Sequence, residues 1–380
     1  MNFELSEEHL LIQQAARDFA QNELLPGVIE RDDKMYTPPE IYRAMSELGF
    51  MGMMTDTRYG GGGMDTISYV LAMEEISKVD NSASVAMSVN NSLVCWGLEE
   101  FGTEEQKKKY LEPLAKGHIL GAFCLSEPEA GSDATHQRTT AIDKGDHYLL
   151  NGVKNWITNG SIASVYLVIA QSDIEKGYKG INALIVEKAW DGVEVGPKEH
   201  KMGIRASDTH SISFSDVKVP KENLIYKEGF GFKFAMKTLA GGRIGIAAQA
   251  LGIASGAYER ALQYSKEREA FGKPISHFQA IQFKLADMLT RIEAARALIY
   301  KAAWLKDQEE DYSMASSMAK VFASEAAMWV TTEAVQVHGG YGYVKEFHVE
   351  RLMRDAKITQ IYEGTSEIQR IVISRSILRD

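Results

Sequence analysis

The spacing of apolar residues changes twice along the 380-residue chain, and this change constrains the fold more than any other feature. Up to about residue 120 apolar residues recur with a helical period, as Leu10, Leu11, Ala15 and Phe19 do on one face. Between about 121 and 225 the period falls to two, which is typical of strands. The helical period then returns in long Ala-, Met- and Leu-rich runs, at residues 243–268, 276–308, 313–338 and 345–377. The chain is therefore predicted to be a multidomain α+β protein, with a helical domain at 1–120, a β domain at 121–225 and a helical bundle at 226–380.

Capping patterns predict where the first helices begin and end. Ser6 is a predicted N-cap, and residues 37–40 (TPPE) read as a capping box with proline at the first helical position. Thr103, with Gln106 three residues on, predicts the start of another helix. Two of these helices are predicted to stop at glycines, Gly49 and Gly117.

Short apolar segments separated by turn signals indicate the strands. Residues 148–150 meet an Asn151-Gly152 pair, which is a hairpin signal, and residues 153–158 continue beyond it. The other predicted strands are short runs at residues 165–170, 183–186 and 211–214. Several short strands with turns between them indicate a small antiparallel barrel or sandwich.

The composition excludes several classes of function. A net charge of −10 argues against nucleic acid or an anionic membrane as the main partner. Two cysteines, Cys95 and Cys124, are too few for a disulfide framework or a cysteine-rich metal site. The N-terminus has neither a secretory nor a transit-peptide pattern, and no apolar stretch approaches the roughly 20 residues that span a bilayer. We expect a cytoplasmic protein without membrane insertion, or a mitochondrial-matrix protein whose presequence was removed.

Residues 354–370, RDAKITQIYEGTSEIQR, place the carboxylate of Glu363 at a break between two helical runs. The helical period continues up to Tyr362, and Gly364 then breaks it. Ser366, with Gln369 three residues on, forms a capping-box pattern that predicts the start of the next helix. Glu363 is therefore expected where backbone amides turn outward and a helix N-terminus favours negative charge. By itself this pattern also fits a surface glutamate near a helix start.

A second polar segment, FCLSEPEAGS at residues 123–132, lies where helical runs give way to strands. Pro128 and Gly131 predict a turn, while Ser126 and Ser132 offer hydroxyl groups beside exposed backbone amides. Taken alone, this segment also fits a polar loop between domains.

A third segment, KNWITNG at residues 154–160, carries an aromatic and a hydroxyl side chain two residues apart. Strand alternation places Trp156 and Thr158 on the same face. Taken alone, this segment also fits a tryptophan buried inside a barrel.

Together, in this order and spacing, the three segments resemble acyl-CoA dehydrogenases over essentially the whole chain. Residues 268–272 (REAFG) and 336–340 (QVHGG) fit further flavin-contacting stretches of that family, and residues 241–254 and 283–288 are most similar to its short-chain, butyryl-type members. The resemblance implies the acyl-CoA dehydrogenase fold, with an N-terminal helical domain, a central antiparallel β-barrel and a C-terminal four-helix bundle. It also implies bound FAD, although the chain contains no G-x-G-x-x-G motif.

In the family the flavin lies between barrel and bundle, and Thr158 would donate a hydrogen bond to N5, the atom that receives hydride. The implied contacts of the flavin ring and its surroundings are Phe123, Leu125, Ser126, Gly131, Ser132, Trp156, Ile157 and Thr158. The implied contacts of the diphosphate and adenine of a flavin in a neighbouring subunit are Arg268, Phe271, Gln336, Gly339 and Gly340. The cofactor-binding set is completed by Phe278, Gln279, Val337, Ile358, Ile361, Thr365 and Glu367. A flavin shared between subunits implies a homo-oligomer, and the family pattern is a homotetramer, a dimer of dimers.

The implied reaction converts a saturated acyl-CoA to a trans-2-enoyl-CoA. Glu363 would take the α-proton while the β-hydride passes to the flavin, and the backbone N–H of Glu363 would help to hold the thioester oxygen. Because a glutamate near its reference pKa of about 4.3 is a weak base, burial is expected to raise the pKa of Glu363. The implied substrate contacts besides Glu363 are Ser132, Met236, Leu239, Arg243, Tyr362 and Gly364.

Three positions narrow the expected substrate. Isovaleryl-type enzymes carry their base at the position of Gly242, which cannot titrate here, so the base is assigned to Glu363. Glutaryl-type enzymes place an arginine at the position of Ser84, so a dicarboxylyl substrate is disfavoured. Many relatives have Asp at the position of Ala240, where it contacts CoA, and this difference bears on CoA binding.

The resemblance implies that electrons pass to an electron transfer flavoprotein, with a short straight-chain acyl-CoA such as butyryl-CoA as substrate. Three other interpretations remain open: a branched-chain substrate, an oxidase-like enzyme that uses oxygen, and a non-catalytic CoA-binding relative. The nine histidines show no H-E-x-x-H or similar ligand pattern, so no metal site is expected.

Overall fold

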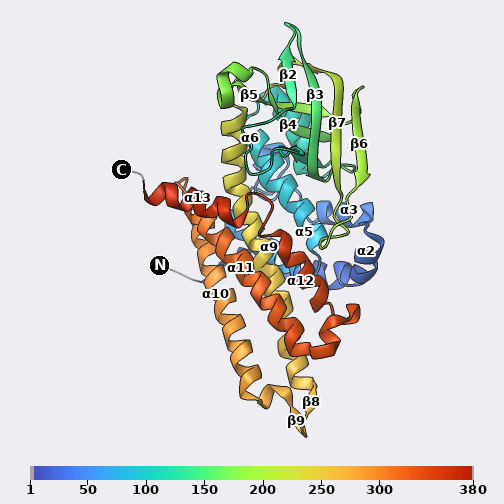
Figure 1. The fold of residues 1–380 in the computed structure, drawn as a ribbon, viewed down its shortest axis with the longest axis vertical. Helices are drawn as coiled ribbons and strands as arrows, with labels where there is room; N and C mark the ends of the chain where they lie inside the picture. The colour runs from blue at the N-terminus through green and yellow to red at the C-terminus, as the bar shows by residue number, and fades with distance from the viewer. Residues whose placement is uncertain (1–3, 379–380) are drawn as a thin grey trace.

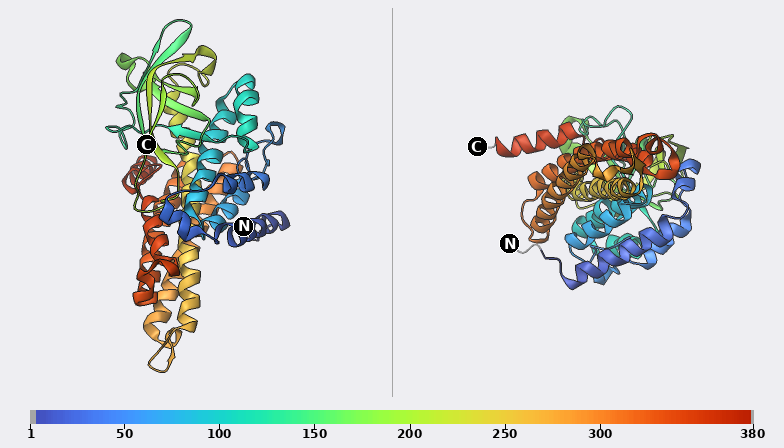
Figure 2. Two further views of the ribbon diagram at one scale, coloured as in Figure 1. Left: turned by 90° about the vertical axis from the view of Figure 1, so that its right-hand side faces the viewer. Right: turned by 90° about the horizontal axis from the view of Figure 1, so that it is seen from below.

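The computed structural model describes residues 4–378, and the other elements are arranged around its longest helix, α9 (Gly231–Glu267) (Figure 1). This helix contacts strands of the β-sheet and also the helices α4, α10, α11 and α12. Figure 2 shows from two further directions that the long helices run side by side below the sheet. A helix of this length spans about 55 Å, so α9 joins one end of the molecule to the other.

The N-terminal part of the chain is helical. Its helices are α1 (Glu7–Phe19), α2 (Val28–Lys34), α3 (Pro39–Glu47), α4 (Thr66–Ser77), α5 (Asn81–Ser88), α6 (Trp96–Phe101), α7 (Glu104–Gln106) and α8 (Glu112–Ala115). Wider π-helical turns extend three of them, at Ala20–Leu24, Val89–Cys95 and Lys107–Leu111. Two glycines of α9 let it approach α4 closely, because a Cβ at Gly252 or Gly256 would lie 2.4 Å from a backbone oxygen of Glu74 or Lys78.

The predicted caps are partly confirmed. Ser6 and Thr103 accept hydrogen bonds from backbone N–H groups three residues on, and Gly49 and Gly117 end their segments with positive φ. The capping box at 37–40 is wrong, since α3 begins after Pro38 without a side-chain cap. The Thr37 hydroxyl instead donates to the Ala206 carbonyl oxygen at 3.2 Å, a tertiary contact that no local pattern reveals.

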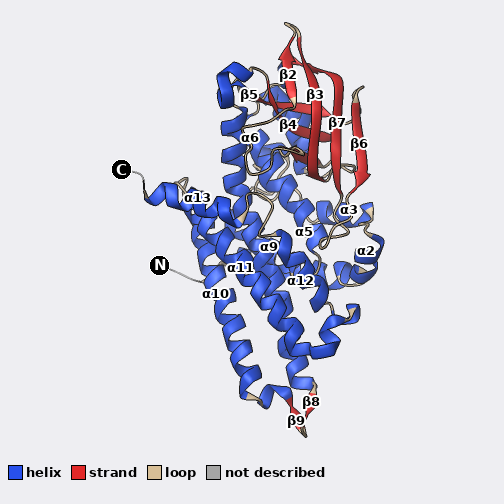
Figure 3. Ribbon diagram, viewed as in Figure 1, coloured by secondary structure: helices blue, strands red, loops and turns tan. Residues whose placement is uncertain are grey.

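The middle part of the chain forms a seven-stranded sheet that curls into a half-barrel at one end of the molecule, as Figure 3 shows in red. Its strands are β1 (Gly121–Cys124), β2 (Thr140–Asp143), β3 (His147–Thr158), β4 (Val165–Gln171), β5 (Ile181–Glu187), β6 (Val193–Lys198) and β7 (Thr209–Pro220). The strand order is β1-β4-β2-β3-β7-β6, and β5 pairs with β4. Most pairs are antiparallel as expected, but β4 pairs in parallel with β1 and, at Thr140 and Gln171, with β2. The pairing with β1 follows from the long connection through β2 and β3, which lets β4 enter the sheet in the same direction as β1.

The predicted hairpin at Asn151-Gly152 is wrong. Both residues lie inside β3, where the register with β7 shifts and Gly152 has a φ of 141°. Asn151 exchanges two hydrogen bonds with Asp216 of β7, at 3.0 and 2.8 Å. The pair therefore forms a bulge within one long strand rather than a turn.

The C-terminal part returns to helices. They are α10 (Gln279–Asp307), α11 (Ser313–His338), α12 (Val349–Ile358) and α13 (Ser366–Ile377), and a small hairpin, β8 (Glu269–Ala270) and β9 (Lys273–Pro274), joins α9 to α10. Helices α9 to α12 pack against one another as the predicted bundle, and α13 packs on α11. The sheet ends at Pro220 and α9 begins at Gly231. We propose domain limits at residues 120 and 225.

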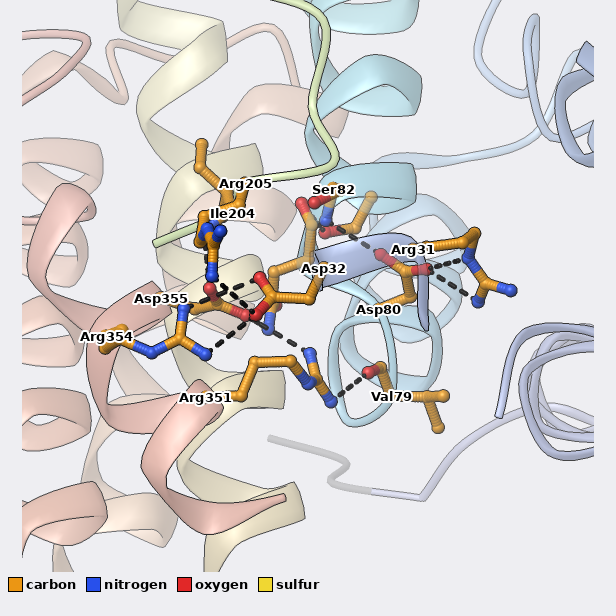
Figure 4. A network of polar contacts seen from close by, with 12 residues as sticks. Arg31, Asp32, Val79, Asp80, Ser82, Ile204, Arg205, Arg351, Arg354 and Asp355 are labelled. Atoms are coloured by element: carbon orange, nitrogen blue, oxygen red, sulfur yellow. Dashed lines mark hydrogen bonds and ion pairs between the residues drawn. The ribbon is translucent and has the colours of Figure 1, made fainter. Parts of the chain in front are cut away.

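A buried network of charged groups joins the three parts of the chain (Figure 4). Asp32 of α2 pairs with Arg354 of α12 at 2.8 Å. Asp355 of α12 accepts hydrogen bonds from the Ile204 backbone N–H at 2.5 Å and from Arg351 at 3.2 Å. Since Asp355 is 1% exposed and Arg351 4% exposed, removing either charge of this pair would leave the other unpaired in the interior.

Within residues 4–378, no helix is both long enough and apolar enough to cross a membrane.

Candidate active site

The loop between α12 and α13 carries Glu363 in a left-handed backbone conformation. Glu363 has a φ of 51° and Gly364 a φ of 93°, so the predicted break between two helices is confirmed. The predicted cap at Ser366 is wrong by one residue: the Thr365 hydroxyl accepts the Ile368 N–H, and the Ser366 hydroxyl is buried without a partner among the described residues. The loop fixes the direction of Glu363 before the last helix begins.

The Glu363 carboxylate lies against α9. A Cβ added at Gly242 would lie 2.1 Å from Glu363 Oε2 and 2.8 Å from Leu93 Cδ2. This Oε2 atom is buried and has no hydrogen-bond partner within residues 4–378. Burial raises the pKa of Glu363 to about 7, and the nearby positive charges of Lys320 and Arg243 only partly oppose that increase. A carboxyl group in this state can accept a proton at neutral pH.

Two further predicted substrate contacts lie beside this carboxylate. Arg243 is 5% exposed and donates to the Ser317 hydroxyl at 3.2 Å, while its Nε has no partner among the described residues. Burial lowers the pKa of Arg243 despite the charge of Glu363. The Tyr362 hydroxyl donates to Gln249 Oε1. The structure thus brings Tyr362, Glu363, Gly364 and Arg243 together, as the sequence predicts.

An apolar cluster connects this region to the sheet. Phe123 at the end of β1 stacks on Phe234 of α9 with ring centroids 6.3 Å apart. Leu125, Met236 and Leu239 pack against the same cluster, which also contains Leu93. Four residues predicted from separate segments therefore line one apolar region between the sheet and α9, namely Phe123, Leu125, Met236 and Leu239.

Hydrogen bonds hold the two polar segments of the middle part, at residues 123–132 and 154–160, next to each other. The Asn155 N–H donates to the Ser126 carbonyl oxygen at 2.8 Å, and the fully buried Lys154 donates to the Leu125 carbonyl oxygen at 2.9 Å and to Glu127 at 2.7 Å. Burial lowers the pKa of Lys154 to about 8, although the Glu127 charge opposes this. The segments 123–127 and 154–158 therefore form one unit.

The tryptophan of the third segment faces outward. Trp156 is 60% exposed and has a φ of 60°, while Ile157 packs in the core of the sheet. Thr158 is partly exposed next to the buried Ile157, and the regular alternation is interrupted between Lys154 and Ile157, where the register with β7 shifts. The alternative of a tryptophan buried in a barrel is wrong. Gly131 and Ser132 are exposed on the loop that follows β1.

The remaining predicted cofactor residues form a second group at the far end of the bundle. Arg268 follows α9 and lies 5.6 Å from the ring centroid of Tyr341, and Phe271 at the tip of the β8–β9 hairpin is 96% exposed with its ring edge toward Phe278. Gln279 opens α10, Gln336 and Val337 end α11, and Gly339 and Gly340 follow them. The distance along α9 from Arg243 to Glu267 is about 36 Å by helix rise. The structure does not bring this second group to Glu363 within one chain.

The four other predicted cofactor residues surround the Glu363 loop. Ile358 ends α12 and Thr365 caps α13; the exposed Ile361 lies in the loop between them, and the exposed Glu367 lies in the first turn of α13.

Three side chains of this region were not among the predicted residues: Gln249, Lys320 and Gln369. Lys320 is the only basic residue in the run MASSMAKVFASEAA, and a cation among mostly small and apolar residues is the signal that could have identified it. Gln249 and Gln369 carry no comparable local signal. Among residues 4–378 no group of three or more His, Cys, Asp or Glu side chains could hold a metal ion.

Family comparisons cover nearly the whole chain. Residues 6–118 match the acyl-CoA dehydrogenase N-terminal domain, residues 122–217 the middle domain and residues 229–378 the C-terminal domain.

Relatives and solved structures agree with the domain matches. The short-chain specific acyl-CoA dehydrogenase of Clostridium acetobutylicum is 51% identical over 379 residues, covering 100% of both chains. The structure of butyryl-CoA dehydrogenase from Megasphaera elsdenii is 50% identical and superposes with a TM-score of 0.98 over 100% of both chains. A chain 54% identical, with a TM-score of 0.99 over 100% of both chains, occurs in a structure described as an electron transferring flavoprotein of Acidaminococcus fermentans. The domain matches, these identities and the shared fold show that the chain belongs to the acyl-CoA dehydrogenase family.

Proposed function

We propose that this protein is an FAD-dependent dehydrogenase of short straight-chain acyl-CoA thioesters, with butyryl-CoA as the reference substrate and a trans-2-enoyl-CoA as product. The proposal rests on family membership together with one observation, the buried and unpartnered Glu363 Oε2 beside Gly242. A carboxylate without hydrogen-bond partners is a stronger base than one in water, because nothing stabilises its charge except distant cations. Glu363 would remove the α-proton of the thioester.

The polar groups around Glu363 are placed to bind a thioester and so to make its α-proton more acidic. The Glu363 backbone N–H donates no hydrogen bond within residues 4–378, so it is free to bind the thioester oxygen as negative charge develops there. Arg243, with an unpartnered Nε next to the carboxylate, would bind a polar part of the substrate. Ser132, Tyr362 and Gly364 remain proposed contacts of the CoA arm and the loop.

The residues present fit FAD. Members of this family are flavoproteins, and when bound the flavin supplies the acceptor for the β-hydride. Trp156 and Phe271 are large aromatic side chains held outward at positive φ, an arrangement that costs free energy without a ligand or partner to cover it. Segments 123–126 and 156–158 would hold the flavin ring, and the Thr158 hydroxyl would donate to its N5.

The second group of residues supports a homo-oligomer, which we propose is a homotetramer. Arg268, Phe271 and Gln336 lie at the far end of α9 from Glu363, too distant to contact the flavin that the same chain's Trp156 would hold. They would instead bind the diphosphate and adenine of a flavin in a neighbouring subunit. Each site would then need two chains.

The surroundings of Ser84 favour an uncharged acyl chain. Ser84, at the position of the glutaryl-type arginine, accepts a hydrogen bond from Gln249 at 3.0 Å, and Gln249 is in turn bonded to the Tyr362 hydroxyl. This closed chain of neutral groups offers nothing to pair with a distal carboxylate. The electron acceptor we propose is an electron transfer flavoprotein, and a branched acyl chain or oxygen as acceptor is the alternative.

The test is anaerobic reduction of the enzyme-bound flavin by butyryl-CoA, measured as the loss of the flavin's yellow absorbance. Replacing Glu363 with glutamine should slow reduction by at least about 1,000-fold, since glutamine cannot accept the proton. The matched control is Glu325→Gln, a 45% exposed carboxylate on α11 that pairs with Arg370 at the surface. Near-normal reduction by the Glu363→Gln variant would remove Glu363 from the mechanism. A colourless protein made in a full supply of riboflavin would contradict the whole proposal, and peroxide formation in place of flavoprotein reduction would favour the oxidase.

A further inference from the structure

A fully buried lysine reaches the Glu363 loop from α11. Lys320 is 0% exposed, and its Nζ donates to the carbonyl oxygens of Tyr362 at 2.9 Å and Gly364 at 2.5 Å. These two residues immediately precede and follow Glu363. A single ammonium group therefore holds the backbone on both sides of the proposed base.

A second side chain completes the frame from α13. Gln369, also 0% exposed, donates through Nε2 to the carbonyl oxygens of Glu363 at 3.3 Å and Gly364 at 2.9 Å. The three successive carbonyl groups of residues 362–364 are thus all held by side chains of two different helices. With its carbonyl groups fixed, the peptide that carries the Glu363 N–H has one orientation.

The hydrogen bonds from Lys320 and Gln369 stabilise an unfavourable backbone conformation at Glu363. A left-handed conformation at a non-glycine residue costs roughly 1 kcal/mol or more and persists only where surrounding contacts hold it. Burying a lysine is also unfavourable: burial, together with the nearby charge of Arg243, lowers the pKa of Lys320 to about 7, and the charges of Glu363 and Glu367 only partly oppose this. An apolar side chain would fill the same space at lower cost. Lys320 therefore serves the loop rather than the core.

We propose that Lys320 is a positioning residue for the dehydrogenation: it holds residues 362–364 so that the Glu363 carboxylate faces Gly242 while the Glu363 N–H stays free for the substrate. The proposal rests on the function proposed above. Lys320 acts through the backbone and through its charge, without contacting the substrate. Two consequences follow, one for the rate of proton transfer and one for its pH dependence.

The rate consequence is geometric. Without Lys320 the loop loses the donor that holds two of its three carbonyl groups, and a displacement of the base of about 1 Å is enough to slow the reaction about 100-fold. The variant Lys320→Met keeps the length of the side chain and removes its donors. We expect kcat to fall about 100-fold with KM changed less than about threefold. A substrate deuterated at the α-carbon should show a larger isotope effect, because proton removal then limits the rate more fully.

The pH consequence is electrostatic. The charged and titratable groups that face Glu363 are Lys320 from α11, Arg243 from α9, and the hydroxyls of Tyr69 and Tyr362. Removing the positive charge of Lys320 removes an influence that lowers the pKa of Glu363. The acid limb of the rate profile should therefore move to higher pH in Lys320→Met and stay in place in Lys320→Arg, which keeps the charge and should recover part of kcat.

The control is Lys198→Met. Lys198 also donates through Nζ to two backbone carbonyl oxygens, of Met35 and Ala206, and neither belongs to the loop that carries Glu363. We expect this variant to lose thermal stability without a change in kcat or in the acid limb. Flavin content and melting temperature are measured for every variant, so a loss of fold is recognised separately from a loss of positioning.

The outcomes separate the two proposals. If the wild type does not reduce its flavin with butyryl-CoA, or Glu363→Gln still does, the proposed function fails. If those results hold but Lys320→Met keeps kcat within about threefold and its acid limb in place, the role of Lys320 is refuted. If Lys320→Met does not fold, the Lys320→Arg variant decides. An acid limb at the wild-type pH together with a partly retained kcat supports the positioning role of Lys320. A kcat below one-hundredth of the wild-type value together with a shifted acid limb overturns that role.

Discussion

Replacing Gly242 with alanine should inactivate the enzyme without unfolding it. The added Cβ would lie 2.1 Å from Glu363 Oε2 and 2.8 Å from Leu93 Cδ2. Ordinary contact begins near 3.4 Å, so the carboxylate must retreat by roughly 1.3 Å. Both atoms are the far ends of flexible side chains, and their displacement costs little folding free energy. The same displacement moves the proposed base away from its working position.

The expected magnitude follows from that displacement. A misplacement of about 1 Å can cost about 100-fold in rate, which corresponds to about 2.7 kcal/mol of activation free energy. Alanine also favours the helical conformation over glycine by roughly 1 kcal/mol in a helix interior. The free energy of unfolding of the Gly242→Ala variant should therefore stay within about 1 kcal/mol of the wild type while flavin reduction slows about 100-fold.

The neighbouring residue supplies a matched control. A Cβ added at Gly241 meets only the Tyr312 hydroxyl, at 3.8 Å, so Gly241→Ala gains the same helix propensity without touching Glu363. Stopped-flow flavin reduction by butyryl-CoA and urea unfolding, measured on both variants, separate rate from stability. If Gly242→Ala reduces its flavin within twofold of Gly241→Ala, the carboxylate does not work from the position beside α9.

Three further predictions follow from charges in the interior. The rate of flavin reduction should rise with pH with a midpoint near 7, because burial raises the pKa of Glu363 to about 7 and only the carboxylate accepts a proton; a stopped-flow midpoint near 4.3 would contradict that burial. The same raised pKa means that the folded state holds this proton more tightly than the unfolded state, so the stability it contributes is present at low pH and lost as pH rises through about 7. The Asp355→Ala variant should lose about 3–5 kcal/mol in urea unfolding, because Arg351 stays buried without its partner. The exposed Asp191→Ala variant is its control, and a loss below about 1 kcal/mol for Asp355→Ala would mean that the network of Figure 4 is solvated.

Local signals predicted the elements whose stabilising contacts are local. The caps at Ser6 and Thr103 depend on a backbone N–H three residues away, so a short window of sequence contains both partners. The hairpin prediction at Asn151-Gly152 was wrong for the opposite reason, because the contact that decides the structure there is not local. The partner of Asn151 is Asp216, 65 residues further along the chain, and the same dipeptide forms a bulge when such a partner strand is present and a turn when it is not.

The candidate site also has features that the local sequence predicts and features that depend on tertiary contacts. The break that carries Glu363 could be predicted from Gly364 and the helix that follows, although its cap was placed one residue too late. The identity of Glu363 as the base came from resemblance, because nothing in the periodicity reveals that the carboxylate meets Gly242, 121 residues earlier. The frame of Lys320 and Gln369 depends on three helices meeting, which only the tertiary structure provides.

The buried charges that join α2, the Ile204 segment and α12 limit how this chain can be recombined with its relatives. A chimera that exchanges one of the three matched regions keeps its own core but inherits half of the interior ion pair between Asp32 and Arg354. Such hybrids would assemble well only when the donor sequence carries the complementary residue at that position. A few interior charges therefore constrain modular exchange in this protein.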